Sequence, residues 1–201
     1  MLILRSSPPS PFGRKVKIAA AILGLADRIK IEITDTNDPS DSIRKQNPLG
    51  KIPALVLEDG SVLFDSPVIL EYLDALAGGG KIIPREGPAR WSTLRLHAIA
   101  DGIMDAALLQ VYEKRFRPEE HWVAKWTDYQ AEKVTRALDV LEAAPPILGA
   151  MPDMGHIGVA CALGYLDLRF EGKWRANYPK LVAWLDRFAA QVPAFEKTKV
   201  Q

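Results

Sequence analysis

The chain opens with two short apolar runs on either side of one amphipathic segment. Hydrophobic residues at 1–4 predict a strand, and the apolar spacing of residues 12–25 predicts an amphipathic helix that stops at Gly24. Residues 28–33 alternate strictly between charged side chains and isoleucine, which is typical of a strand with one face in solvent. Together these segments predict a βαβ unit.

A hairpin and a second helix follow this unit. Residues 35–47 are polar and rich in turn formers, with room for one short helix. Apolar residues at 52–57 and 62–64 lie on both sides of the turn sequence at 58–61, which predicts a β-hairpin. A helix is predicted to begin at Asp65-Ser66-Pro67. The first part of the chain should therefore form a small sheet with helices packed on it.

The hydrophobic pattern changes after a glycine-rich segment at residues 77–81. Strand patterns end there, and the rest of the chain shows only helical spacing. The helices predicted in this half cover residues 88–116, 118–141, 154–170 and 179–191. The pattern therefore predicts an α/β (α+β) domain at residues 1–77, a linker at 78–87 and an all-α domain at 88–201.

The charges of the chain are nearly balanced, with 26 lysines and arginines, 25 aspartates and glutamates and a formal net charge of +1. No basic cluster stands out, so neither nucleic acid nor an anionic membrane surface is expected as the main partner. No stretch approaches the roughly 20 apolar residues of a membrane helix, and no signal-like apolar run opens the chain. We therefore expect a soluble cytoplasmic protein.

Residues that commonly form disulfides or bind metals are few. Cys161 is the only cysteine, which excludes an internal disulfide and a CxxC redox pair, and its apolar helical surroundings favour a buried, inert thiol. His97, His121 and His156 are scattered, and none has a neighbour at the spacing of a metal site. No metal is therefore predicted.

Candidate chemistry lies at two predicted helix starts. Ser10 is a favoured N-cap residue, and Pro11 suits the first helical position; Asp65-Ser66-Pro67 has the same form. Unpaired N–H groups and the helix dipole at such starts favour an anion. Two of them in one small domain suggest a ligand with two negative groups, while two ordinary helix caps are the alternative interpretation.

These segments also match known motifs. Ser10-Pro11-Phe12-Gly13 lies directly after the first strand, where glutaredoxins carry Cys-Pro-Tyr-Cys, and Ile52-Pro53 lies where the thioredoxin fold keeps a cis-proline. Further matching blocks span the chain at residues 10–16, 47–53, 65–73, 100–106, 160–167 and 178–185. On these blocks the chain resembles the cytosolic glutathione transferase family, and within it the bacterial YibF-like group. The resemblance implies a thioredoxin-like first domain and an all-helical second domain.

The resemblance also implies a glutathione site in the first domain. The backbone of Ile52, ahead of a cis-Pro53, would pair with the cysteinyl part of glutathione. Ser66 would bind the carboxylate of the γ-glutamyl end, while Asp65 would attract its amino group. Lys51 would lie along the peptide.

Asp101 matches a position that reaches the glutathione of the partner subunit in some members of the family. This correspondence implies a homodimer in which each subunit completes the other's site.

Ser10 is implied to face the glutathione sulfur. A hydroxyl is not basic enough to remove the thiol proton, so Ser10 would instead donate a hydrogen bond to the thiolate, the nucleophilic form. Ser6 and Ser7 compete for this role, because serine-type members differ in the length of this loop. The glutaredoxin frame and the Pro11 that follows favour Ser10.

The thiolate would attack a small apolar electrophile between the domains. The residues expected to hold this electrophile are Phe12, Met104, Leu108 and Tyr112. All four also suit a hydrophobic core. The leading hypothesis is a glutathione transferase; the alternatives are a glutathione-binding or protein-interaction module without significant catalysis, and a glutathione-dependent lyase, dehalogenase or peroxidase.

The chain departs from the family pattern at the start of its third predicted long helix. The family usually has a Ser/Thr-x-x-Asp capping box there, whereas this chain reads Asp153-Met154-Gly155-His156. Asp153 can cap the helix, but no reciprocal carboxylate is present, which predicts a weaker helix start.

Overall fold

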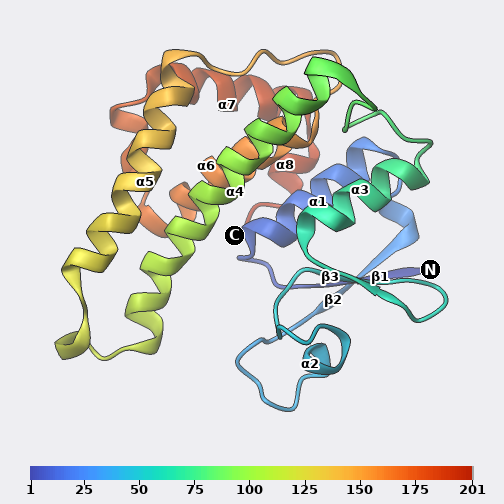
Figure 1. The fold of residues 1–201 in the computed structure, drawn as a ribbon, viewed down its shortest axis with the longest axis horizontal. Coiled ribbons are helices and arrows are strands. Elements are labelled where there is room, and N and C mark those ends of the chain that lie inside the picture. The colour runs from blue at the N-terminus through green and yellow to red at the C-terminus, as the bar shows by residue number, and fades with distance from the viewer. Residues whose placement is uncertain (201) are drawn as a thin grey trace.

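The computed structural model describes residues 1–200, which form a sheet domain and a helical domain packed side by side (Figure 1). The elements of the first domain are β1 (Leu2–Ser6), α1 (Pro11–Ile22), β2 (Ile29–Ile33), α2 (Ile43–Gln46), β3 (Ala54–Val56), β4 (Val62–Leu63) and α3 (Ser66–Leu76). The strand order is β2-β1-β3-β4. β1 and β2 are parallel and the other pairs antiparallel, as the predicted βαβ unit and hairpin require.

Burial explains how this sheet is layered. β1 is central and largely buried, whereas β2 lies at the edge and leaves Ile31 and Ile33 exposed. Helices α1 and α3 lie together on one side of the sheet, and α2 lies on the other (Figure 1). The buried aliphatic side chains of α1, α3, β1 and β3 belong to one hydrophobic core. The expected thioredoxin-like domain is therefore present.

The second domain is entirely helical within the described part of the chain. Its helices are α4 (Gly87–Phe116), α5 (Ala124–Ala143), α6 (Met154–Phe170), α7 (Pro179–Gln191) and α8 (Ala194–Lys197). Short 3₁₀ segments cover Ala26–Arg28, Glu119–His121 and Lys173–Ala176. No helix described here combines the length and apolar composition needed to cross a membrane.

The predicted helix over 118–141 begins later than its apolar spacing suggested. A 3₁₀ turn occupies Glu119–His121, and α5 starts only at Ala124. The Glu113 carboxylate, on α4, accepts a hydrogen bond at 2.9 Å from the N–H of Val123, the N-cap residue of α5, and so anchors the start of this helix. Periodicity carries no information about such a contact.

Helix α6 lies at the centre of the second domain and runs in the same direction as α4. A side chain at Gly155 would lie 2.9 Å from Leu96 Cβ, and one at Gly158 would lie 3.0 Å from Ala100 Cβ. The contacts advance along both helices together, which establishes that they are parallel. Small residues on α6 thus allow α4 to approach closely.

The start of α6 is more completely capped than the sequence predicted. The Asp153 carboxylate accepts hydrogen bonds from the His156 N–H at 3.0 Å and from the Thr93 hydroxyl at 2.5 Å. His156 Nδ1 lies 3.2 Å from the Asp153 backbone nitrogen and 2.6 Å from an Asp153 carboxylate oxygen, and His156 Nε2 lies 2.9 Å from the Ile147 carbonyl oxygen. The expectation of a missing reciprocal partner was therefore wrong, because an imidazole completes the capping box.

The segment between α3 and α4 is ordered by one carboxylate. Asp74 accepts hydrogen bonds from the backbone N–H groups of Gly80, Lys81 and Ile82 at 2.7, 2.9 and 2.8 Å. The Ile82 carbonyl then accepts from the N–H of Met154 at the start of α6. These bonds attach the glycine-rich connection to both domains.

Candidate functional site

The N-terminus of α1 is the centre of the candidate site. Ser10 is its N-cap residue, and the Ser10 Oγ accepts a hydrogen bond from the Gly13 N–H at 3.1 Å. Its own hydroxyl hydrogen is donated to no group within residues 1–200 and can therefore be offered to a bound anion. Gly13 is required because a methyl group there would lie 2.0 Å from Ser6 Oγ. The helix start consequently lies directly against the end of β1.

The three candidate serines differ in their surroundings. Ser6 is fully buried under Gly13, and its hydroxyl lies 3.4 Å from the Ser7 carbonyl oxygen. Ser7 is half-buried, and its carbonyl accepts the Ser10 N–H at 3.2 Å. Only Ser10 combines partial exposure with a position at the helix N-terminus. The geometry therefore favours Ser10 for contact with an anion.

A second helix start and a loop lie beside the first. Asp65 is the exposed N-cap residue of α3 and makes no capping bond with its side chain, while Ser66 is buried. The Ile52–Pro53 peptide bond is cis, as the thioredoxin-like motif predicted. The backbone of Ile52 makes no hydrogen bond to any other residue in 1–200, and Lys51 next to it is exposed. These groups are accessible to a peptide ligand.

A buried ion pair joins α1 to α4 just behind this face. The Lys15 side chain has no exposed area, pairs with Asp101 and lies 2.9 Å from His97 Nε2. Burial and the adjacent Lys15 charge lower the pKa of His97 to about 3, so the imidazole is neutral. Burial raises the pKa of Asp101 against the opposing effect of Lys15. The Asp101 side chain is 19% exposed, so one edge of the pair reaches the surface.

Asp105 belongs to the same face, although the sequence analysis did not select it. Burial and the negative charges of Asp101 and Asp65 raise the pKa of Asp105, while Lys51 and Lys15 oppose the rise. The carboxylate therefore shares its electrostatic environment with residues of both domains. The sequence could have identified Asp105 by its position one helical turn after Asp101, which places both carboxylates on the same face of the helix.

The four residues expected around an apolar electrophile differ in their burial. Met104 is fully buried in the core. Phe12, Leu108 and Tyr112 are half-buried, and the Tyr112 ring meets Phe116 edge-on at 5.1 Å. Leu108 and Tyr112 lie on the second half of α4, one turn apart. The structure thus brings part of the predicted set to the domain surface and places Met104 inside.

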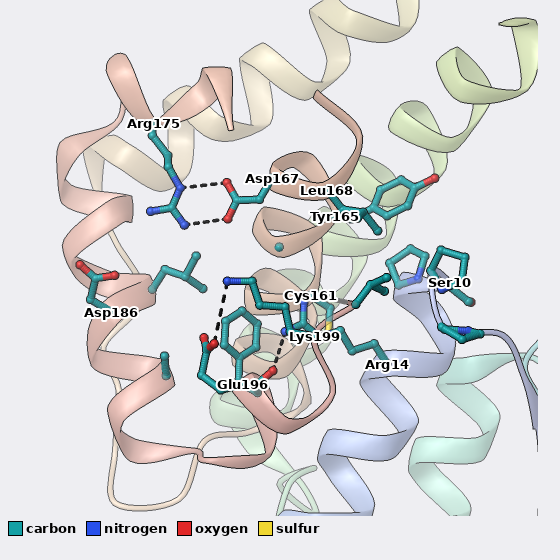
Figure 2. A pocket seen from close by; sticks show the side chains of 18 residues that line it. Ser10, Arg14, Cys161, Tyr165, Asp167, Leu168, Arg175, Asp186, Glu196 and Lys199 are labelled. Atoms are coloured by element: carbon teal, nitrogen blue, oxygen red, sulfur yellow. Dashed lines mark hydrogen bonds and ion pairs between the residues drawn. The ribbon is translucent and has the colours of Figure 1, made fainter. Parts of the chain in front are cut away.

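A cavity of about 190 Å³ lies between the start of α1 and helices α6, α7 and α8 (Figure 2). Ser10 lines it, together with Tyr165 and Leu168 of α6, which the sequence analysis missed. None of the four predicted apolar residues lines this cavity. Cys161 also lines it, but burial raises the pKa of its thiol to about 11, in agreement with the predicted inert thiol.

Arg14 forms one side of the cavity. Its guanidinium donates to the Phe195 carbonyl at 2.6 Å and to the Thr198 hydroxyl at 3.2 Å. A side chain at Gly164 would lie 2.5 Å from Arg14 Nη1, so a glycine is needed there. Arg14 thereby connects the helix that carries Ser10 to the last helix of the chain.

The fold and this face together define the class of protein. Family models for the N-terminal and C-terminal domains of glutathione S-transferase match residues 9–76 and 103–187. The chain belongs to the glutathione S-transferase family.

Particular relatives extend over nearly the whole chain. The uncharacterised GST-like protein YibF of Escherichia coli is 33% identical over 201 residues, which cover 98% of this chain and 97% of YibF. A glutathione transferase family member from Pseudomonas fluorescens Pf-5, solved with bound glutathione, is 42% identical with a TM-score of 0.90, and all of both chains is covered. A second structure from that organism, with bound S-(propanoic acid)-glutathione, is 41% identical with a TM-score of 0.87 and equal coverage.

Proposed function

We propose that this protein is a glutathione transferase that joins the sulfur of glutathione to the carbon of a small electrophile. The thiol first loses its proton to solvent, and the thiolate then forms the S–C bond. A leaving group departs with the bonding electron pair, or an activated double bond takes up a proton. Ser10 would stabilise the thiolate by donating its hydroxyl hydrogen to the sulfur.

The observation that carries this proposal is the incompletely satisfied start of α1. The Ser10 oxygen is occupied by the Gly13 N–H, whereas its hydrogen is donated to no group in residues 1–200. The positive end of the helix dipole adds to this donor, so both effects favour the charged form of a thiol. Each unit by which the thiol pKa falls corresponds to about 1.4 kcal/mol in favour of the thiolate.

The rest of the tripeptide would lie across the neighbouring loop and α3. We assign Ile52 to the cysteinyl backbone, Ser66 to the γ-glutamyl carboxylate and Asp65 to its amino group, with Lys51 along the peptide. The unpaired Ile52 backbone and the free Asp65 side chain support this assignment. The P. fluorescens relatives with bound glutathione and a glutathione S-conjugate support it further.

We also propose a homodimer in which Asp101 contacts the glutathione of the partner subunit. The exposed edge of the Asp101–Lys15 pair would be the contact point. Large exposed apolar residues on α3 and α4, including Val68, Trp91 and Leu109, would lie in the interface.

The test is the pKa of the bound thiol. Calorimetry gives the glutathione affinity, and ultraviolet absorption of the thiolate against pH gives the thiol pKa, in the wild type, in Ser10→Ala and in Ser7→Ala as the matched control. We expect a bound thiol pKa at least one unit below that of free glutathione, abolished by Ser10→Ala and kept by Ser7→Ala. A bound thiol that titrates as in solution would indicate a binding module, and absence of binding would overturn the proposal.

A further inference from the structure

Arg14 carries a buried positive charge that has no carboxylate in direct contact. The residue is only 8% exposed. Within residues 1–200 its hydrogen bonds go only to neutral oxygen atoms, and it forms no salt bridge. Burial lowers the pKa of Arg14, and the negative charges of Glu196 and Asp167 oppose this without reversing it. A buried charge without a close counterion is costly, so an anion from outside the chain would stabilise it.

The two carboxylates that act on Arg14 are engaged with cations of their own. Asp167 accepts two hydrogen bonds from the Arg175 guanidinium at 2.9 and 2.7 Å. Glu196 lies 3.9 Å from the Lys199 ammonium. The positive charge of Arg14 is therefore left for another anion.

One terminal nitrogen of Arg14 remains available to such an anion. Nε donates to the Thr198 hydroxyl and Nη2 to the Phe195 carbonyl, at 3.2 and 2.6 Å. Nη1 has no acceptor within residues 1–200 and is not fully buried. It lies against Gly164, where a Cβ would be only 2.5 Å away. Both Arg14 and Gly164 line the cavity of Figure 2, so a ligand in the cavity can reach Nη1.

The same cavity reaches the proposed sulfur position. Ser10 and Arg14 lie one helical turn apart at the start of α1, and both line the cavity. In Figure 2 the Arg14 side chain lies between Ser10 and Glu196. A molecule whose reactive carbon meets a sulfur at Ser10 can therefore place a second group against Arg14.

The cavity has the size of one substituted ring. Its volume is about 190 Å³, and a cavity of about 150 Å³ accommodates benzene. Apolar side chains contribute to its lining, among them Pro9, Leu168, Ala189 and Phe195. The guanidinium carbon of Arg14 lies 4.1 Å from the centre of the Phe195 ring. The lining thus suits a flat apolar body that ends in an anion.

These features select a particular kind of electrophile. A guanidinium nitrogen binds a carboxylate oxygen through a charge-assisted hydrogen bond, which a neutral amide of the same size cannot match. On the basis of the proposed function, we propose that the second substrate is a small electrophilic carboxylic acid that occupies this cavity, with its carboxylate on Arg14 Nη1. Arg14 is then a specificity-determining residue as well as the connection between α1 and α8.

The carboxylate takes no part in the bond changes. With 4-chloro-3-nitrobenzoate, for example, the glutathione thiolate forms a bond to the ring carbon that carries chlorine, and chloride departs with the electron pair of the broken C–Cl bond. The carboxylate at the opposite end of the ring stays ionised beside Arg14. The corresponding carboxamide reacts by the same step but presents no charge to the guanidinium.

Product conjugates test this inference without requiring turnover. Calorimetry compares S-(4-carboxy-2-nitrophenyl)glutathione with the corresponding carboxamide, which has the same shape without the charge. We expect the wild-type protein to bind the acid at least about 10-fold more tightly than the amide. The acid/amide ratio should fall to within about 2-fold in Arg14→Gln and to an intermediate value in Arg14→Lys.

Gly164→Ala tests the geometry without removing the charge. The added methyl group would lie 2.5 Å from Arg14 Nη1, so the guanidinium must move. We expect the acid/amide ratio to fall at least about 3-fold, because a displaced donor forms a poorer hydrogen bond. This variant decides the question if Arg14→Gln loses the bonds to Phe195 and Thr198 and does not fold.

The control is Lys199→Gln, which removes a positive charge from another residue that lines the same cavity. The Lys199 side chain is 63% exposed. Because solvent screens an exposed charge, the acid/amide ratio of this variant should stay within about 2-fold of the wild type. Unchanged affinity for glutathione itself in every variant establishes that each one is folded.

Several outcomes would overturn the inference. Equal binding of acid and amide by the wild type would do so, as would a ratio that survives Arg14→Gln or, where that variant does not fold, Gly164→Ala. An equal loss in Lys199→Gln would also refute it, because it would indicate general attraction by surface charge. Glutathione binding by the wild type is measured first and separately, and its absence would refute the proposed function together with this inference.

Discussion

Helices α1 and α6 both begin at a favourable N-cap residue, yet the two starts are completed to different degrees. Asp153 at the start of α6 is negatively charged and accepts from both the His156 N–H and the Thr93 hydroxyl. Ser10 at the start of α1 is neutral and accepts one hydrogen bond, and its hydroxyl hydrogen has no acceptor within residues 1–200. The same backbone arrangement is therefore satisfied within the chain at α6, whereas at α1 it leaves a donor available to the ligand proposed above.

The two helix starts also differ in the charge of their N-cap residue. Burial acts to raise the pKa of Asp153, but hydrogen bonds from His156 and Thr93 outweigh it and hold the pKa below its ordinary value. The positive end of the α6 dipole is thus already neutralised by an ionised carboxylate. No such charge is present at the cap of α1, so the proposed thiolate would meet an unopposed dipole.

The largest effect is expected from Asp153→Ala. The substitution removes the helix cap and leaves the Thr93 hydroxyl and the His156 N–H without a partner. We expect the free energy of unfolding to fall by about 2–4 kcal/mol. Urea denaturation measures it, and Asp153→Ser is the control that keeps a cap. A loss below about 1 kcal/mol would show that α6 does not depend on this cap.

Ser10→Asp separates the capping role of Ser10 from its proposed role at the sulfur. Aspartate caps helices as well as serine does, so the free energy of unfolding should stay within about 0.5 kcal/mol of the wild type. Its negative charge would repel the thiolate and raise the bound thiol pKa by at least about one unit. The rate of glutathione conjugation at pH 7 should fall at least about 10-fold. An unchanged rate would exclude Ser10 from contact with the sulfur.

Much of this arrangement follows from local sequence. Ser10-Pro11 and Asp65-Ser66-Pro67 mark helix starts by residue type, and the alternation at 28–33 marks the edge strand, because both signals depend on near neighbours. Helices α4, α6 and α7 were predicted to within one residue of their ends because their apolar spacing is sustained, whereas α5 starts at Ala124 and not at 118.

Contacts between distant residues were not predictable in this way. The bond from the Val123 N–H to the Glu113 carboxylate and the bond from the Thr93 hydroxyl to Asp153 both depend on tertiary packing. Met104 suited either the substrate site or the hydrophobic core by its residue type, and it is fully buried in the core. Such features appear only once the helices are placed in space.

The smallest expected effect is on the pH dependence of folding stability, and it comes from His97 behind α1. The His97 pKa is about 3 in the folded protein against 6.5 in the unfolded chain, so only the unfolded chain gains a proton between these values. The stabilisation associated with neutral His97 is complete above pH 6.5 and is lost as the pH falls toward 3, by at most about 1.4 kcal/mol per pH unit.

His97→Gln removes this titration while keeping a hydrogen-bonding group near Lys15. We expect the variant to lose less stability than the wild type between pH 6.5 and pH 5, as measured by urea denaturation at each pH. Measurements at pH 8, where His97 is neutral in both states, give the baseline. Parallel pH profiles of the two proteins would assign the acid sensitivity to other groups.

Arg14 connects the candidate site to helices at the end of the chain that a ligand at α1 would not contact. Its bonds to the Phe195 carbonyl and the Thr198 hydroxyl join the helix of Ser10 to the end of the chain, and one hydrophobic core continues through both domains. A ligand that binds only the native state stabilises every element that unfolds together with its site. Glutathione bound at α1 would therefore slow amide hydrogen exchange in α7 and α8, helices that it never contacts.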